Sequence, residues 1–171
     1  MLPNPLHPAV VHFPVVLAFL LPIFAIGALW VIRRGSRPRS AWSIPLALAV
    51  GLLISTWAAV QTGEAQEERV ERVVADEPLE THEEAAKALI VSTSVVLLLM
   101  AGGLLPGRIG KSARVLGTIG AIALVVGAAW VGHSGGQLVY QYGAASAYAG
   151  TSVQSATGEV VPKGHDDDDR R

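Results

Sequence analysis

The sequence predicts an all-α integral membrane protein: a four-helix bundle of up-down-up-down topology with both termini on the outer side of the membrane. Hydrophobic residues make up 51% of the 171 residues and charged residues only 16%, which is too apolar for an ordinary soluble domain. Four long uncharged runs follow one another, each close to the roughly 20 residues that cross a hydrocarbon core as a helix. Basic and acidic residues gather in different segments between these runs.

The four apolar runs cover residues 9–32, 43–62, 88–106 and 115–132. The first run exceeds the usual signal-peptide core of roughly 7 to 15 residues, and no positive residue precedes it, so we expect it to remain in the mature protein. In residues 64–75, Glu68 and Arg72 have i, i+4 spacing, which indicates a solvated extension of the second helix.

Two local patterns shape the outer ends of the first and third helices. Pro8 suits a first helical turn, whereas Pro14 leaves the Val10 carbonyl without its usual donor and predicts a bend near His12. In the third helix, Thr81 followed by Glu84 resembles a capping box that starts or restarts the helix beside His82. A start further upstream, near 76–78, is the alternative.

The charge distribution predicts the orientation. The segments after the first and third runs carry basic residues and no acid, and all 14 acidic residues lie in 64–84 or 159–169. The positive-inside rule then makes the basic segments cytoplasmic and the termini periplasmic, in a multi-pass protein of the bacterial inner membrane. The basic residues are Arg33, Arg34, Arg37, Arg39, Arg108, Lys111 and Arg114. We expect one transmembrane domain, 1–143, followed by a flexible polar periplasmic tail, 144–171, in which His165 has no expected role.

Composition narrows the function classes. Cysteine is absent, which excludes disulfides, thiolate-held iron–sulfur clusters, covalently attached c-type haem and thiol nucleophiles. A net charge of −1 gives no reason to expect nucleic acid as a partner. No nucleophile–base pair is apparent, so an electron-transfer or accessory subunit is favoured over a stand-alone enzyme.

Four of the five histidines are expected at the outer side. Counting about 20 residues outward from each basic segment puts His12 and His133 at the edge of the hydrocarbon core, with His7 and His82 about one turn further out. Ionisable groups at the edge of a bundle are site candidates. We therefore predict a cofactor site formed by His7, His12, His82 and His133, with the last three as ligands of a haem iron or of a bare metal.

Haem b fits this set because it needs one or two axial imidazoles and an apolar slot between helices. Small residues near His133 and aromatic residues at the same level suit such a slot: Gly132, Gly135, Gly136, Phe13, Trp57 and Trp130. The alternative cofactor is a transition metal such as copper, iron or zinc. Its shell would be completed by Glu64, Glu83 or Glu84. Gln61, Glu64 or Glu83 could orient the imidazoles.

Several motifs resemble one bacterial family of four-helix membrane proteins of unknown function. They are HP-x-x-VHFP at 7–14, TGEA at 62–65, THEEAA with His82, and GHSGGQLVYQYG at 132–143. The resemblance implies that His7, His12 and His82 are signature residues, whereas some members differ at the position of His133. Members are sometimes fused to, or encoded beside, c-type cytochromes or Rieske proteins, which implies a redox setting.

The leading interpretation is a small haem b-binding, cytochrome-like electron-transfer subunit in the lipid bilayer, with a c-type cytochrome or another redox protein, or a quinone, as partner. A cofactor-free structural or assembly subunit of a larger membrane complex is the first alternative, because Gly117-x-x-x-Ala121 and Ala128-x-x-x-Gly132 suit helix packing. A non-haem metal-binding membrane protein is the second.

Overall fold

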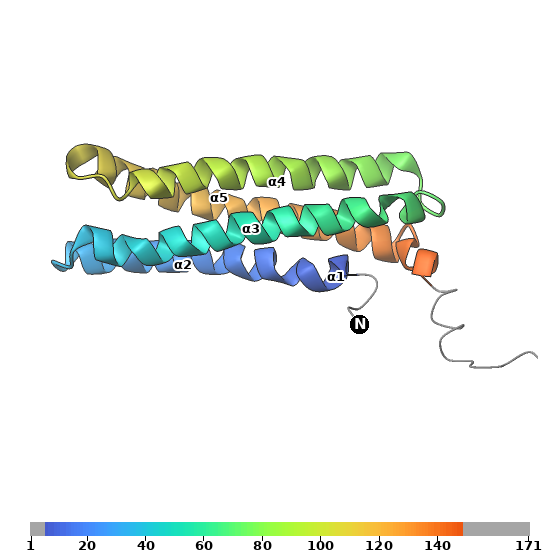
Figure 1. Cartoon of the computed structure of the whole chain (residues 1–171), viewed down its shortest axis with the longest axis horizontal. Helices are drawn as coiled ribbons and strands as arrows, with labels where there is room; N and C mark the ends of the chain where they lie inside the picture. Colours follow the sequence, from blue (N-terminus) through green and yellow to red (C-terminus); the bar gives the residue numbers. More distant parts are fainter. Residues whose placement is uncertain (1–5, 149–171) are drawn as a thin grey trace, which may run out of the picture.

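The computed structural model describes residues 6–148 and confirms the all-α, four-helix architecture (Figure 1). Helices α1 and α2 together form one candidate membrane span, and α3, α4 and α5 form one each. All four spans are long and apolar enough to cross a membrane. The elements in chain order are α1 (His7–Val10), α2 (His12–Arg33), α3 (Pro38–Val70), α4 (Asp76–Gly102), α5 (Gly107–Tyr140) and the 3₁₀ helix η1 (Ala144–Tyr148).

The helices form a square bundle of neighbours. Helix α2 packs against α3 and α5, and α4 also packs against α3 and α5. Helices α2 and α4 are therefore diagonal, as expected from short connections between antiparallel neighbours. In Figure 1 the α2–α3 and α4–α5 turns lie at one end, which we call the basic end (residues 33–39 and 103–114). The α3–α4 turn, α1 and η1 lie at the opposite end, which we call the histidine end.

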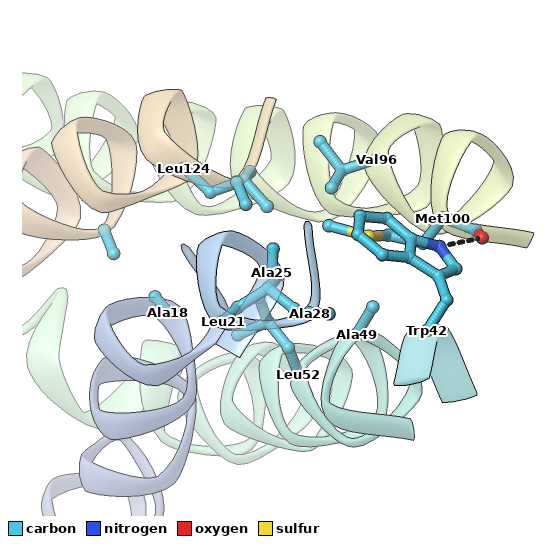
Figure 2. Close-up of a cluster of buried hydrophobic side chains, with 12 residues drawn as sticks. Ala18, Leu21, Ala25, Ala28, Trp42, Ala49, Leu52, Val96, Met100 and Leu124 are labelled. Carbon is cyan, nitrogen blue, oxygen red and sulfur yellow. Dashed lines mark hydrogen bonds between the residues drawn. The ribbon is translucent and has the colours of Figure 1, made fainter. Parts of the chain in front are cut away.

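Alanine dominates the centre of the bundle, and large apolar side chains point outward. The core contains Ala18, Ala25 and Ala49 together with Leu21 and other residues, all almost fully buried (Figure 2). In lipid the hydrophobic effect does not drive helices together, so they associate through close van der Waals packing, which small residues allow. Large exposed side chains, such as Leu98 at 72%, then contact the hydrocarbon. In a soluble bundle the large apolar side chains are mostly in the core instead.

Helix α4 begins earlier than the capping-box pattern indicates. It starts at Asp76 after Ala75, whose backbone is extended, so the upstream alternative is correct. The Thr81 hydroxyl donates to the Glu77 carbonyl at 2.8 Å, inside the helix. The capping-box prediction is therefore wrong, because Thr81 lies in helical backbone and bonds the preceding turn instead of an unpaired N–H.

The predicted extension of the second helix over residues 64–75 is confirmed as far as Val70, and residues 71–74 form a turn and a bend. Helix α3 continues to Val70, beyond the apolar run that ends at residue 62. Beyond its end, Arg72 Nε donates to the Glu68 carbonyl at 3.2 Å.

The predicted bend near His12 appears as a break at Val11, between α1 and α2. Proline at position 14 has no N–H to offer the Val10 carbonyl, so the regular bonding pattern is interrupted there. The short helix α1 also contacts α3. His7 therefore lies in a helical turn that packs against α3.

The described part of the chain extends five residues past 143, the predicted end of the transmembrane domain, to residue 148. Helix η1 packs on α5 and α3, Ala144 is buried, and the Tyr148 hydroxyl donates to Gln66 Oε1 at 2.7 Å. Residues 144–148, assigned from the sequence to the tail, therefore lie against the bundle. The remaining tail, with His165, lies outside the described residues.

Candidate functional site

His7 is half-buried at the histidine end and is fixed against α3. Its Nδ1 lies 2.8 Å from the Ala59 carbonyl oxygen and 3.3 Å from Thr62 Oγ1. A carbonyl oxygen can only accept, so Nδ1 carries the hydrogen and donates it. The hydroxyl of Thr62 donates to the carbonyls of Ala58 and Ala59. In the neutral ring, this arrangement leaves the lone pair on Nε2.

His82 is fixed in the same way against α5. Its Nδ1 lies 2.8 Å from Ser134 Oγ. The Ser134 hydroxyl donates its own hydrogen to the Val131 carbonyl at 3.0 Å, so toward His82 it acts as the acceptor. The neutral His82 ring therefore also has its hydrogen on Nδ1 and its lone pair on Nε2.

The two imidazoles lie close together although they come from different parts of the chain. The ring centroids of His7 and His82 are 6.5 Å apart, and the ring planes are nearly perpendicular, at 85°. With nitrogens about 2 Å from one metal ion, imidazoles on opposite sides would have centroids about 6 Å apart, and a tetrahedral pair about 5 Å. The observed spacing is slightly larger than both values, so the two rings lie near enough to contact one bound group between them.

Glycines give the two rings their space. A Cβ at Gly63 would lie 3.2 Å from His7 Cε1, and one at Gly135 would lie 3.0 Å from His82 Cε1. Both distances are tighter than ordinary van der Waals contact, so any larger side chain would displace a ring. A Cβ at Gly132 or Gly136 would meet no atom within 4 Å. These two glycines lie two residues from Ser134 and therefore point away from His82.

The structure does not bring His12 and His133 to this pair. Both side chains are exposed, and the His133 ring centroid lies 6.3 Å from that of Trp130. Residues five apart on a helix point about 140° from each other, and adjacent residues about 100°. With His7 facing α3 and Ser134 facing His82, the imidazoles at 12 and 133 are turned outward.

The aromatic residues expected to line a slot are also outward. Phe13 is 65% exposed, Trp57 58% and Trp130 61%. That expectation is wrong, because these three side chains lie on the outward faces of their helices and face the surroundings of the bundle. Trp side chains near the end of a membrane helix are typical of the lipid–water interface.

The acidic and amide groups expected near the site bond one another or nearby residues. Gln61 Nε2 donates to Glu64 Oε2 at 2.8 Å, Glu83 pairs with Lys87 at 3.1 Å, and Glu84 is exposed. Within residues 6–148, no group of three or more His, Asp or Glu side chains is gathered as a metal site. The arrangement found is a pair of imidazoles.

The hydrogen-bond acceptors Ala59 and Ser134 were not predicted from the sequence, although TGEA and GHSGG mark their neighbourhoods. A signal for Ser134 exists in the spacing of small residues. Gly117, Ala121 and Ala128 on α5 are buried, and this helical spacing continued toward the histidine end reaches Gly135, the residue after Ser134, so it places the close approach to α4 beside Ser134 and turns His133 away from it.

Residues 3–147 match the family described as "Predicted membrane protein (DUF2231)". The chain belongs to this family. No curated protein and no solved structure gave a significant match. The family match and the four candidate spans together identify a multi-pass membrane protein whose exposed apolar side chains contact the lipid bilayer.

Proposed function

We propose that this protein is a small membrane electron-transfer subunit that holds a b-type haem at its histidine end. His7 and His82 are the proposed axial ligands, because their Nδ1 atoms are engaged and their Nε2 atoms carry the lone pairs. When bound, the haem supplies one-electron redox chemistry. Compared with the set expected from the sequence, the proposed ligands are narrowed from four histidines to two.

The observation that carries this proposal is the fixed orientation of both rings. A histidine that ligates a metal usually donates its other ring N–H to a carbonyl, a carboxylate or another acceptor, which sets the ring orientation and raises the basicity of the ligand. Ala59 O and Ser134 Oγ are acceptors of this kind. Gly63 and Gly135, which lie against the rings, suit the close approach of a flat group.

The proposed setting is the periplasmic side of the bacterial inner membrane, with a c-type cytochrome, another periplasmic redox protein or a quinone as partner. Seven basic residues at the opposite end support this orientation through the positive-inside rule. The absence of cysteine from the chain allows a direct test with single-cysteine variants. A membrane-impermeant maleimide should label Ser146→Cys in cells with a permeabilised outer membrane, and Ser36→Cys only after the inner membrane is opened. The reverse pattern would invert the orientation.

A cofactor-free structural role is the second candidate, and one observation favours it. Each imidazole already links two helices, α1 to α3 through His7 and α4 to α5 through His82. Interhelical hydrogen bonds of this kind hold membrane bundles together at about 0.6 kcal/mol each on average. A structural role uses only the Nδ1 atoms of His7 and His82 and gives no function to their Nε2 atoms. A bare copper, iron or zinc ion bound by the same two nitrogens, with further donors, is the remaining alternative.

Asparagine substitutions separate these roles. The side-chain amide of Asn can replace the Nδ1–H donor, but it has no counterpart of Nε2. After expression with a haem supply, the purified wild-type protein should show a Soret band. His7→Asn and His82→Asn should each lose the spectrum of the six-coordinate haem, while the exposed His12→Asn and His133→Asn should retain it as matched controls.

Three results would contradict the haem assignment. The first is a wild-type protein without a Soret band, in which case metal analysis of the same sample distinguishes a bare metal from a cofactor-free protein. The second is an unchanged spectrum in both His7→Asn and His82→Asn. The third is loss of the spectrum in the two control variants alone.

A further inference from the structure

A cavity at the basic end, far from the histidines, is lined by three arginines. Its volume is about 380 Å³, and Arg37, Arg39 and Arg114 line it together with Leu104 and Leu105 of the α4–α5 turn. The proposed cofactor site uses none of these residues. The cavity therefore needs its own explanation.

Arg114 is the unusual residue of this cavity because it is only 8% exposed. Its Nη1 donates to the Gly103 carbonyl at 2.5 Å, which satisfies a carbonyl beyond the end of α4. A guanidinium has five N–H donors. Among the described residues this is the one hydrogen bond of the Arg114 side chain, and no carboxylate forms an ion pair with it. A buried charge without a counterion is costly, so an anion in the cavity would be stabilised.

The other two arginines add to the same positive field. Arg37 and Arg39 are exposed at the mouth of the cavity, and Arg39 Nε donates to the Leu104 carbonyl at 3.2 Å. The sequence has no acidic residue before Glu64 and none between Glu84 and Glu159. No carboxylate from the segments that build this end is therefore available to neutralise the three guanidinium groups.

We propose that this cavity binds the phosphodiester headgroup of an anionic phospholipid such as phosphatidylglycerol. Arginine forks match phosphate oxygens in charge and geometry, and basic pockets between membrane helices bind anionic headgroups. The source is assigned to lipid because the rest of the lining is apolar, with Leu104, Leu105 and Pro106. These side chains suit the glycerol and upper acyl region of a lipid, and a soluble phosphate would leave them uncovered.

The test uses the full-length protein in mild detergent with phosphatidylglycerol as the probe, and native mass spectrometry as the readout. The double variant Arg37→Gln/Arg39→Gln should bind this lipid at least about 10-fold more weakly, since each arginine near an anionic headgroup contributes appreciably to affinity. The matched control, Arg33→Gln/Arg108→Gln, removes two charges from the same end but none from the cavity lining. It should change binding by less than about threefold. Both doubles keep the buried Arg114, and the thermal unfolding midpoint of each is measured alongside, because Arg39→Gln also removes the hydrogen bond to the Leu104 carbonyl.

Three outcomes would overturn the proposal. Equal losses in the two double variants would show general attraction to a basic surface. Equal binding of zwitterionic phosphatidylcholine would remove the need for an anionic lipid. Inorganic phosphate that displaces phosphatidylglycerol at similar concentration would assign the site to a soluble anion. Retained binding in the control, with weak phosphatidylcholine binding and no displacement by phosphate, supports the lipid site.

Discussion

The two ends of the bundle both carry polar contacts between helices, but the groups that they satisfy differ. At the basic end the donors bond main-chain carbonyls in the last turn of α4 and just beyond it, where the i to i−4 pattern ends. Trp42 donates to Met100 at 2.8 Å (Figure 2), Arg114 to Gly103, and Arg39 to Leu104. The Met100 carbonyl also accepts the Gly103 N–H at 3.1 Å.

At the histidine end the acceptors have other partners. Ala59 lies inside α3, where the helix itself supplies a donor to its carbonyl, and Ser134 is an α5 side chain that bonds its own helix. At the basic end, Arg39 and Arg114 supply donors to carbonyls beyond the end of α4. The two histidines instead donate to acceptors that already have partners inside α3 and α5. This difference favours a role for the histidines beyond structure, and the following substitutions test it through stability.

Matched glycine substitutions should give the largest difference between the ends. A Cβ at Gly103 would overlap the Trp42 indole nitrogen, while one at Gly63 would lie 3.2 Å from the His7 ring edge. Gly103→Ala should destabilise by about 3 kcal/mol, because overpacking displaces a buried ring. Gly63→Ala should cost about 1 kcal/mol or less, since a half-buried ring can move. Denaturant unfolding in detergent micelles measures both, with Gly27→Ala, which has open space, as the control. Equal losses at the two sites would remove the contrast.

Trp42→Phe should have the next largest effect. Trp42 is fully buried, and the substitution removes the donor to the Met100 carbonyl together with part of the packed ring. We expect a loss of about 2 kcal/mol from the lost hydrogen bond and the cavity combined, since the Met100 carbonyl keeps the Gly103 N–H as a donor at 3.1 Å. The thermal unfolding midpoint compared with that of Trp30→Phe, an exposed tryptophan on α2, measures it. A midpoint no lower than that of the control would show that the hydrogen bond is dispensable.

The double variant His7→Asn/His82→Asn should change stability by less than about 1 kcal/mol in the cofactor-free protein, because Asn retains a donor in each place. His7→Ala/His82→Ala should be less stable than the Asn pair by about the strength of two interhelical hydrogen bonds, roughly 1 kcal/mol in total. Unfolding in mixed micelles compares the two doubles. A large loss in the Asn pair would mean that the ring edges themselves hold this end together.

Thr93→Val should have the smallest effect, and its sign should be opposite. Thr93 is 1% exposed, and within the described part of the chain its hydroxyl has no hydrogen-bond partner. Replacing an unsatisfied hydroxyl by a methyl group should stabilise by up to about 1 kcal/mol. Thr56→Val, which removes a hydroxyl that bonds the Leu52 carbonyl at 2.8 Å, is the comparison and should not stabilise. Loss of stability in both variants would show that the Thr93 hydroxyl has a hydrogen-bond partner in the folded protein.

Sequence reasoning succeeded where hydropathy and charge decide the structure. The four crossings follow from the length of the apolar runs, and the break beside His12 follows from Pro14. The start of α4 was ambiguous, because Thr81 and Glu84 imitate a capping pair within a longer polar helix.

The rotation of each helix about its axis was not predicted. In lipid the outward face is as apolar as the inward face, so hydrophobic periodicity does not show which side of α2 or α5 faces the bundle. Counting residues from the basic segments therefore predicted the depth of His12 and His133 in the membrane, but not whether their side chains face the bundle or its surroundings. Small residues, of which Ser134 is one, carry the directional information instead, because they mark where two backbones come close.

The break at Val11 lies between the turn that bears His7 and the membrane span of α2, although Val11 keeps a helical backbone and donates to the His7 carbonyl at 3.1 Å. The hydrogen bond from Nδ1 of His7 to the Ala59 carbonyl is a second attachment of this turn. Because the turn stands at the end of the helix and Pro14 withholds a donor from it, its opening should cost less free energy than the opening of α2. Amide hydrogens at 9–11 should accordingly exchange with solvent well before those deeper in α2.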